Sequence, residues 1–330
     1  MKLCFFVNDL ANELPTYTTT RLAMTAGARG HDVWYIDAGD FACDPDDVVR
    51  AHAWHPPQGV TDGKVFLADA ATGERQRVGL DEFDAMVIRN DPADDLVERP
   101  WAQNIGLLFG ELAARHGVVV LNDPVGMARA VNKLYLEHLP RSTRPESIIT
   151  RNVDDVREFV ERHGGEAVLK PLQGSGGEGV FFVHPEDGVN IDQMVSSLAR
   201  DGYLAAQEVL PNAQDGDIRL FLVDGEPLQV DGTYAAFRRV PAEGEARSNM
   251  RAGGRPVATE VDEAVLELVE AIRPQLVEDG MFFVGLDIID ARLVEINVFS
   301  PGGIGSCQLV TGVDFTPRIV DAIEQHVAAA

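Results

Sequence analysis

The sequence is poor in cysteine and in long apolar runs. Its 330 residues include three cysteines, which are too few and too scattered for a disulfide framework or a zinc site. No apolar run approaches the roughly 20 residues that a membrane-spanning helix needs. The first apolar stretch, residues 3–7, ends at Asn8 and Asp9 and is too short for a signal sequence. We therefore expect a cytoplasmic protein without a membrane partner.

Positive charge is also scarce. The 28 basic residues are outnumbered by 53 acidic ones, which gives a formal net charge of −25. The lysines among them are Lys2, Lys64, Lys133 and Lys170. Such a surface repels the phosphates of nucleic acids and of anionic lipids, so neither is expected as a partner. A hydrophobic fraction of 45% still indicates a folded chain, and its length is enough for two or three domains.

The predicted elements change in character along the chain. At first, apolar strands alternate with helices, which is typical of a parallel α/β sheet; the strands are expected at 3–7, 33–36, 85–89 and 118–121, and the helices at 19–29 and 102–115. A polar stretch over 37–81 interrupts this pattern. Strands then predominate after a helix at 153–163, at 167–170, 180–183, 204–209, 218–223 and 228–230, with a hairpin turn at Asp224-Gly225. The last expected elements are helices at 260–279 and 315–327 and, between them, a pair of strands at 282–288 and 293–298.

A lysine and a cluster of glycines follow one of these strands. Lys170 ends the strand, and the segment before the next strand contains Gly174, Gly176, Gly177 and Gly179. Glycines let backbone amides approach an anion and a lysine adds a point charge, so the segment favours phosphate binding. Neither a Gly-Lys-Ser sequence nor a helix follows, which excludes a Walker loop and a Rossmann fingerprint. A flexible hairpin turn with an exposed lysine is the alternative.

Polar side chains recur in the last pair of strands. Strand alternation places Glu295 and Asn297 on one face, and the hairpin can bring Asp287 beside them. Two carboxylates and an amide oxygen are hard ligands suited to Mg²⁺ that is shared with substrate phosphates. A solvated sheet face is the alternative, but acids in otherwise apolar strands are costly to bury unpaired. The spacing therefore favours a metal site.

Basic residues gather in residues 238–255, where five arginines stand against two glutamates. Glycines at 244, 253 and 254 add backbone freedom. A basic, glycine-bearing loop between a strand and a helix is compatible with a lid over an anionic substrate. A loop whose arginines pair with surface acids explains this composition equally well. The position of the loop in the sequence does not distinguish the lid from the surface loop.

Taken together, these features resemble the ATP-grasp carboxylate–amine ligases, and most closely the bacterial glutathione synthetases. The matching stretches extend over nearly the whole chain and include residues 87–92, 131–134, 169–177, 215–220, 283–289 and 295–297. The resemblance implies an α/β and α+β architecture in which an N-terminal pre-ATP-grasp parallel-sheet domain precedes a two-lobed ATP-grasp domain. The expected boundaries are 1–122 for the first domain, 123–211 for the lobe with the phosphate lid, and 212–330 for the lobe with the magnesium ligands and the arginine-rich lid.

The resemblance also implies a set of site residues. ATP is expected to contact Lys133, Lys170, Gly174, Ser175, Gly176, Gly177, Gln207, Glu208, Val209 and Leu210. Magnesium, as two ions or replaced by Mn²⁺, is expected at Asp287, Glu295 and Asn297. Arg219 and Arg239 are the catalytic candidates that stabilise the oxyanion, and the expected substrate contacts are Arg89, Arg247, Asn249, Arg255, Ser300, Pro301 and Gly302. An ion pair between domains is the alternative role for Arg89.

The implied reaction joins a dipeptide acid to an amino-acid amine through an acyl phosphate, in a protein that is expected to form homo-oligomers. Glutathione formation from γ-glutamylcysteine and glycine is the leading interpretation, ahead of a ligase for a different acid or amine and of a non-catalytic ATP-binding regulator. The chain departs from the family pattern in two places. Residues 90–93 read Asn-Asp-Pro-Ala, and Gly305 and Ser306 stand where the family has Arg-Glu, next to the expected amine site.

Overall fold

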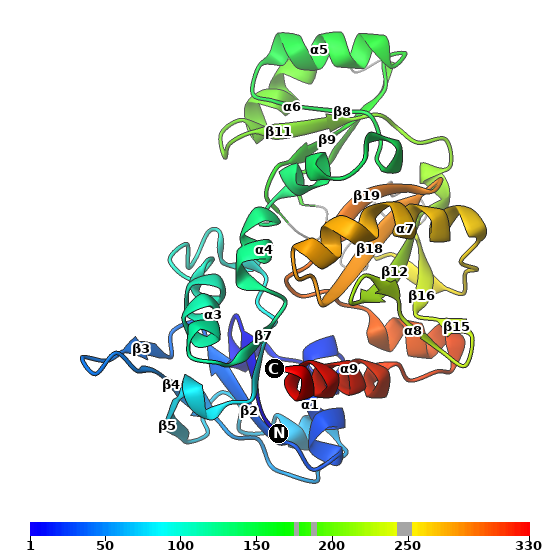
Figure 1. Ribbon diagram of the computed structural model, residues 1–330. Helices are drawn as coiled ribbons and strands as arrows, with labels where there is room; N and C mark the ends of the chain where they lie inside the picture. The colour runs from blue at the N-terminus through cyan, green and yellow to red at the C-terminus, as the bar shows by residue number, and fades with distance from the viewer. Residues whose placement is uncertain (175–177, 186–189, 243–252) are drawn as a thin grey trace.

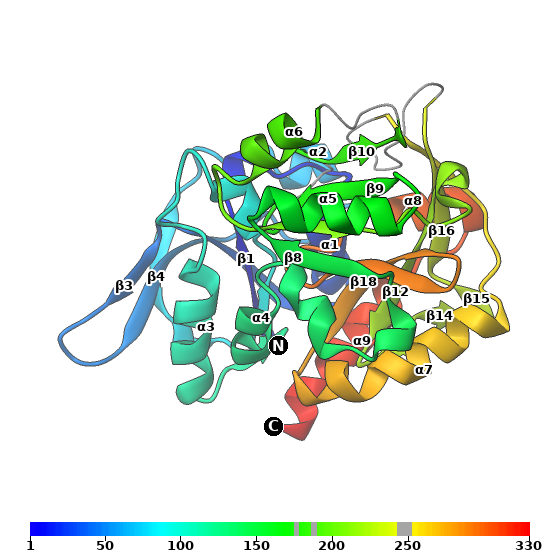
Figure 2. The same ribbon diagram turned by 90° about the horizontal axis from the view of Figure 1, so that it is seen from above.

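The computed structural model describes residues 1–174, 178–185, 190–242 and 253–330. Figure 1 shows an N-terminal domain at the bottom, a lobe that carries α5 (Val153–Arg162) at the top, and a lobe that carries α7 (Glu263–Glu278) beside and between them. Seen from above, the α5 lobe lies over the junction of the other two bodies (Figure 2). Among the described residues, no helix has the length and apolar character needed to cross a bilayer.

The N-terminal domain contains the parallel sheet that the sequence predicts. Its parallel strands lie side by side in the order β2 (Asp32–Asp37), β1 (Lys2–Val7), β6 (Ala85–Ile88) and β7 (Val119–Leu121). The two longer helices of this domain are α1 (Thr18–Ala28) and α3 (Ile105–Arg115). Because parallel strands end at the same edge, the residues after β1 and β6 lie close together and face the rest of the molecule.

The sheet also has an antiparallel part, which the sequence did not predict. The polar stretch over 37–81 contains β3 (Phe41–Cys43), β4 (Val49–Trp54), α2 (Gly63–Phe66) and β5 (Arg75–Gly79). These strands extend the sheet antiparallel beyond β2. In β4 Val49, Ala51 and Ala53 are buried while the residues between them are more exposed. The period of two is thus present, but the many charged residues around it hide it in the sequence.

The α5 lobe is a four-stranded antiparallel sheet under two helices. Its order is β10 (Phe181–Val183), β9 (Ala167–Pro171), β11 (Leu204–Gln207) and β8 (Ser147–Thr150), and α5 and α6 (Ile191–Leu198) cover one face. Alternation along β9 decides which residues face the helices. Ala167 and Leu169 join the apolar core with α5 and α6, whereas Val168 and Lys170 face the cavity described below.

The α7 lobe is built on a second antiparallel sheet. The strands follow the order β17 (Arg255–Val257), β16 (Ala236–Val240), β12 (Asp217–Val223), β18 (Phe283–Ile289) and β19 (Arg292–Asn297), and β13 (Glu226–Pro227) pairs with β12. The predicted hairpin turn at Asp224-Gly225 is confirmed, with φ of 53° and 77°. Leu286 and Ile288 pack in the same core as α7, so the alternate residues Gly285 and Asp287 face the other side of the sheet.

The remaining elements are short. They are β14 (Gln229–Val230), β15 (Thr233–Tyr234), α4 (Pro124–Arg129), α8 (Ile304–Thr311) and 3₁₀ helices at Leu10–Asn12, Leu80–Glu82, Pro92–Asp95, Lys133–His138, Arg141–Thr143 and Ala213–Asp215. Helices of this length do not show a recognisable apolar period, so the sequence did not predict them.

Contacts between distant parts of the chain hold the N-terminal domain against the α7 lobe. Asn122 donates from Nδ2 to the carbonyl oxygen of Val298 at 2.6 Å, and its Oδ1 accepts from the amide of Phe283 at 2.6 Å. The last helix, α9 (Thr316–Ala329), lies beside α1 (Figure 1). There Thr25 and Thr316 share a hydroxyl hydrogen bond of 2.7 Å. These contacts fix the two walls of the cavity between the bodies.

Candidate active site

A cavity of about 920 Å³ lies where the three bodies meet. The N-terminal domain contributes Asn8 and Arg89, which follow the parallel strands β1 and β6. The α5 lobe contributes Lys170 from β9, and the α7 lobe contributes Asp287 and Glu295 from β18 and β19. The carboxyl edge of a parallel sheet and a crevice between bodies are both common places for small-molecule sites.

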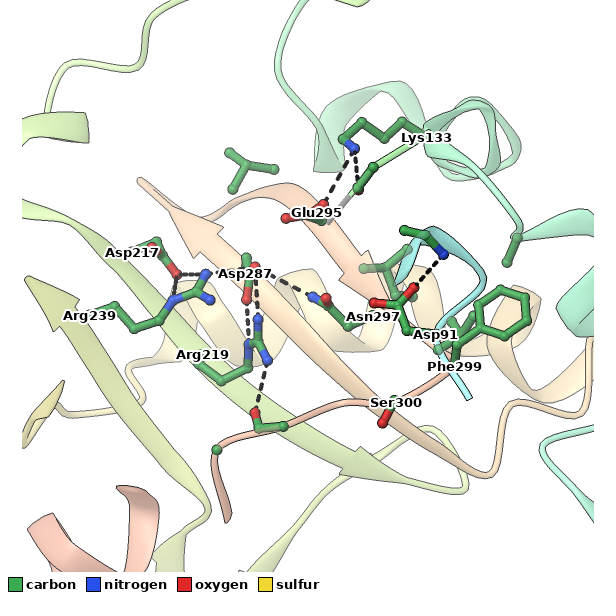
Figure 3. A pocket seen from close by; sticks show the side chains of 18 of the residues that line it. Asp91, Lys133, Asp217, Arg219, Arg239, Asp287, Glu295, Asn297, Phe299 and Ser300 are labelled. Atoms are coloured by element: carbon green, nitrogen blue, oxygen red, sulfur yellow. Dashed lines mark hydrogen bonds and ion pairs between the residues drawn. The ribbon is translucent and has the colours of Figure 1, made fainter. Parts of the chain in front are cut away.

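Asp287 is the centre of a buried network of charges. Arg219, its register partner on β12, donates from Nε and from Nη2 to the two carboxylate oxygens, the second at 3.0 Å. Arg239 reaches the same carboxylate from Nη2 at 2.6 Å and donates from Nε to Asp217 at 2.9 Å. Figure 3 shows Asp287 between these two guanidinium groups. Burial opposes the ionisation of Asp287, but the two arginines outweigh it and hold its pKa well below its usual range.

The structure brings the three expected magnesium ligands together. Asp287 pairs with Glu295 and Gly285 pairs with Asn297 across the β18–β19 hairpin, so all three side chains share the face that borders the cavity. Asn297 donates from Nδ2 to Asp287 at 3.4 Å. Among the described residues no cluster of three acidic, histidine or cysteine side chains forms a closed metal cage. Two carboxylates and one amide oxygen instead fit a hard cation whose other ligands come from phosphate oxygens.

The two lysines approach this face from the opposite wall. Lys133 lies 3.6 Å from the carboxylate of Glu295 and donates to the carbonyl oxygen of Gly174 at 3.2 Å. Lys170 donates to Oε1 of the buried Gln207 at 2.7 Å. Burial lowers the pKa of Lys170 to about 8, although the nearby Glu295 partly counteracts this. The part of the cavity between lysines and carboxylates therefore combines positive charge with metal ligands.

If Lys170 contacts ATP as predicted, its titration should make nucleotide binding depend on pH. An anion that binds here must raise the pKa of Lys170 above 8, so binding takes up a proton once the pH exceeds that value. We expect the Kd for ATP, measured by calorimetry, to rise above pH 8 by up to about tenfold per pH unit. Arginine does not titrate in this range, so Lys170→Arg is the matched control and should lose this slope. An equal slope in both proteins would show that another group is responsible.

The strand end that is expected to contact adenine also borders the cavity. Gln207, Glu208 and Leu210 line it, whereas Val209 does not. The backbone amide of Glu208 donates to the carbonyl oxygen of Glu146 at 2.9 Å, and its carboxylate accepts from the amide of Glu146 at 2.6 Å. Apolar side chains complete this wall, namely Val168, Phe182, Ile289 and Ile296. An apolar slot beside backbone polar groups is suited to a flat aromatic base.

Several expected site residues lie elsewhere or outside the described part of the chain. Ser175, Gly176, Gly177, Arg247 and Asn249 fall outside the described residues. The structure places Arg255 at an exposed position on β17, and it does not border the cavity. Ser300 and Gly302 line the cavity, while Pro301 lies behind the wall.

Arg89 is buried at the interface between the N-terminal domain and the α7 lobe. It donates from Nε to the hydroxyl of Thr19 at 3.1 Å and from Nη2 to the carbonyl oxygen of Pro301 at 3.0 Å. Both partners are neutral, and among the described residues no carboxylate forms an ion pair with Arg89. The structure therefore does not support the alternative role of Arg89 in an ion pair between domains. Burial lowers its pKa to about 10, against the field of Glu13, and Arg89 remains charged at neutral pH.

The sequence did not single out the residues that follow β1. Glu13 and Arg21 line the cavity together with Thr16, Tyr17, Thr18 and Thr19. Burial raises the pKa of Glu13 to about 7, although a hydrogen bond from Thr20 at 3.0 Å and the charge of Arg89 favour its ionised form. Only their position after the first strand could have indicated these residues, because loops after the first strand of a parallel sheet commonly carry ligand contacts.

Glu13 is expected to destabilise the folded protein at alkaline pH. Its folded pKa of about 7 lies above the unfolded value near 4.5, so the folded state binds the proton more tightly and stability falls as the pH rises between these values. Glu13→Gln removes this titration. We expect the variant to gain about 2 kcal/mol over the parent at pH 8 and little at pH 5, measured by urea unfolding. The exposed Glu158→Gln is the control, and an equal gain at both pH values would contradict the assignment.

The arrangement of the sheets matches that of solved ligases. The D-cycloserine synthetase DcsG superposes with a TM-score of 0.64 at 16% identity, over 99% of this chain and 100% of that one. The ATP-grasp ligase PsnB complexed with minimal precursor superposes with a TM-score of 0.62 at 19% identity, over 99% of both chains. The fold is thus that of the ATP-grasp proteins. Together with the sequence comparison that follows, it makes the chain an ATP-dependent carboxylate–amine ligase.

Sequence comparison assigns the family within this class. The model of the prokaryotic glutathione synthetase N-terminal domain matches residues 1–127, and that of the prokaryotic glutathione synthetase ATP-grasp domain matches residues 132–312. Glutathione synthetase of Synechococcus elongatus is 34% identical over 99% of both chains, and that of Vibrio parahaemolyticus is 32% identical over 93% of this chain and 92% of the relative. The chain belongs to the prokaryotic glutathione synthetase family.

Proposed function

We propose that this protein forms glutathione from γ-glutamylcysteine, glycine and ATP, with release of ADP and phosphate. The observation that carries the proposal is the meeting, in one cavity, of two lysines, the face of the β18–β19 hairpin that carries Asp287, Glu295 and Asn297, and arginines from the N-terminal domain. Full-length similarity to glutathione synthetases supports the choice of substrates. A ligase for a different acid or amine on the same scaffold is the second candidate, because Gly305 and Ser306 depart from the family pattern.

The first step activates the acid. A carboxylate oxygen of γ-glutamylcysteine attacks the γ-phosphorus of ATP, the bond to the β-phosphate oxygen breaks, and an acyl phosphate and ADP result. Lys133 and Lys170 neutralise the phosphates and position them for in-line attack. Asp287, Glu295 and Asn297 would hold magnesium, which would supply further charge neutralisation for the phosphate oxygens. Arg219 and Arg239 keep Asp287 ionised, so that it remains a metal ligand over the whole neutral pH range.

The second step forms the amide bond. The amine of glycine attacks the acyl carbon and loses a proton, and phosphate leaves when the tetrahedral intermediate collapses. The developing oxyanion needs a fixed donor, and Arg219 fits this role because it lines the cavity and its Nη1 donates to Gly302 at 3.0 Å, beside the expected acceptor site. Glu13 and Arg89 present opposite charges in the same part of the cavity, which suits the zwitterionic end of a γ-glutamyl peptide.

The test of this function is substrate-dependent release of ADP. The purified protein is assayed with γ-glutamylcysteine and glycine together and with each omitted, and the product is identified by its mass. We expect ADP and glutathione in equal amounts only in the complete mixture. Turnover with another amine but not with glycine would favour the second candidate, whereas no substrate-dependent ADP with any acid and amine would contradict ligase activity.

The proposal also covers the number of metal ions, the assembly state, the location in the cell and the domain boundaries. We expect two Mg²⁺ ions per active site, replaceable by Mn²⁺, because the transferred phosphate must be neutralised on both sides. We also expect a homo-oligomer in the cytoplasm, with the domain boundaries at 122 and 211. Metal titration monitored by the ADP assay and light scattering of the purified protein test the ion number and the assembly state.

A further inference from the structure

Arg21 is a cavity-lining cation without an acidic partner among the residues that the structure describes. It lies on α1, and its Nη2 donates to the side-chain oxygen of Gln308 on α8. Its Nε is buried without any hydrogen-bond partner. Lys133, Arg219 and Arg239 line the same cavity, and each of them forms an ion pair with a carboxylate. In the described part of the chain no carboxylate forms an ion pair with Arg21.

A buried, unpaired donor of a guanidinium is costly unless a ligand satisfies it. Leaving such a donor unsatisfied costs about 1–3 kcal/mol, and more when the group is charged. A guanidinium has five N–H donors, and the described contacts of Arg21 use one of them. The neutral amide of Gln308 orients the group without cancelling its charge. The geometry is that of a preformed anion contact, which a carboxylate suits because guanidinium and carboxylate match in shape.

The guanidinium of Arg21 occupies the space beside Gly305, in the first turn of α8. A Cβ atom on Gly305 would lie 3.7 Å from Nη1 of Arg21 and 3.7 Å from the carbonyl oxygen of Thr16, at ordinary contact distance. A cation from α1, 284 positions away in sequence, lies in the same part of the cavity.

We propose that Arg21 binds a carboxylate of the amino-acid substrates in the part of the cavity beside Gly305. The inference rests on the proposed function for the identity of the substrates. The carboxylate of glycine and the free carboxylate of the γ-glutamyl end share this chemistry, and separate measurements distinguish them. A binding cation of this kind also makes the enzyme prefer amines that carry a carboxylate.

Substitution of Arg21 tests the assignment through substrate affinity. We expect Arg21→Ala to raise the KM for one of the two substrates by about 10- to 100-fold, because a hydrogen bond to a charged group contributes about 1.5–3 kcal/mol. The glycine concentration is varied at saturating γ-glutamylcysteine, and the γ-glutamylcysteine concentration is then varied at saturating glycine. The two titrations identify the substrate whose KM rises. The Kd for ATP, measured alone, should stay within twofold. Arg200→Ala, at an exposed position, is the matched control.

Two further measurements separate binding from a structural role. Glycinamide lacks the carboxylate, so if Arg21 binds glycine, the turnover of glycinamide should be equal in the parent and in Arg21→Ala. The double variant Arg21→Ala/Gly305→Arg returns a cation to the same space from α8, and we expect it to recover at least part of the lost affinity. If Arg21→Ala does not fold, Arg21→Gln, which keeps most of the side-chain stem, replaces it in every assay.

The outcomes are distinguishable from failure of the proposed function. If the parent protein does not turn over γ-glutamylcysteine and glycine, the proposed substrates are wrong, and the acid and amine that it does use are tested in the same way. If the parent is active and Arg21→Ala leaves both KM values unchanged, the inference is overturned. It is also overturned if the variant weakens ATP binding as much as substrate binding, since that result indicates a structural role.

Discussion

Asp287→Asn is expected to abolish turnover and to destabilise the protein at the same time. Asparagine keeps the shape of the side chain but removes the charge that two buried arginines share. Removing one partner of a buried ion pair costs about 3–5 kcal/mol, because the remaining charge stays buried without compensation. The same substitution weakens the magnesium face, so we expect the rate of ADP release to fall by about 10³-fold or more.

The two effects of Asp287→Asn can be measured separately. Urea unfolding gives the loss of stability, and ADP release at increasing Mg²⁺ concentrations gives the loss of turnover. Asp287→Glu keeps the charge but shifts its position, so it should recover part of the stability and little of the turnover. Asp201→Asn, at an exposed position in the α5 lobe, is the control and should change neither. Normal turnover of Asp287→Asn at the Mg²⁺ concentration that saturates the parent would contradict the metal assignment.

Lys170→Ala is expected to lower kcat/KM for ATP by about 10²- to 10³-fold, because it removes a buried cation from the phosphate-facing wall. The folded state should tolerate the change well, since burial already disfavours the charged form of this lysine. Steady-state ADP release and the Kd for ATP from calorimetry measure the effect.

The small number of lysines makes the control for Lys170→Ala unusually clear. Lys64→Ala removes an exposed lysine on α2, far from the cavity lining, and should leave kcat/KM and the Kd for ATP unchanged. Lys170→Arg keeps the charge and should retain more activity than the alanine variant. The phosphate assignment fails if Lys170→Ala binds ATP and turns it over like the parent.

The magnesium face was predictable from the sequence because its geometry is local. Glu295 and Asn297 are two residues apart on one strand, and a tight hairpin returns the chain to Asp287 within eight positions. A period of two and a short turn suffice to place all three on one face. The position of Lys170 on β9 follows from the same alternation. The parallel core of the N-terminal domain was predictable for a similar reason, since its strands are short, fully apolar runs.

The antiparallel extension of that sheet and the environment of Asp287 were harder to predict from the sequence. The strand β4 alternates in burial, but the charged residues around it hide the period in a composition dominated by acids. Arg219 and Arg239 were expected to act on the oxyanion, yet the structure shows that both also hold Asp287 in its ionised form. That pairing depends on the order β16-β12-β18, which no local pattern specifies.

By itself, the sequence determined the class of most elements and the shared face of Asp287, Glu295 and Asn297 on the hairpin, since each depends on neighbours within a few residues. Only the tertiary structure decided which cations remain free for substrate. Arg89 meets Pro301 across 212 positions and Arg21 meets Gln308 across 287, and both contacts exist because the N-terminal domain packs against the α7 lobe and its last helix. Such docking is set by the complementarity of whole surfaces and by the summed burial of many apolar side chains, and no spacing along the chain encodes it.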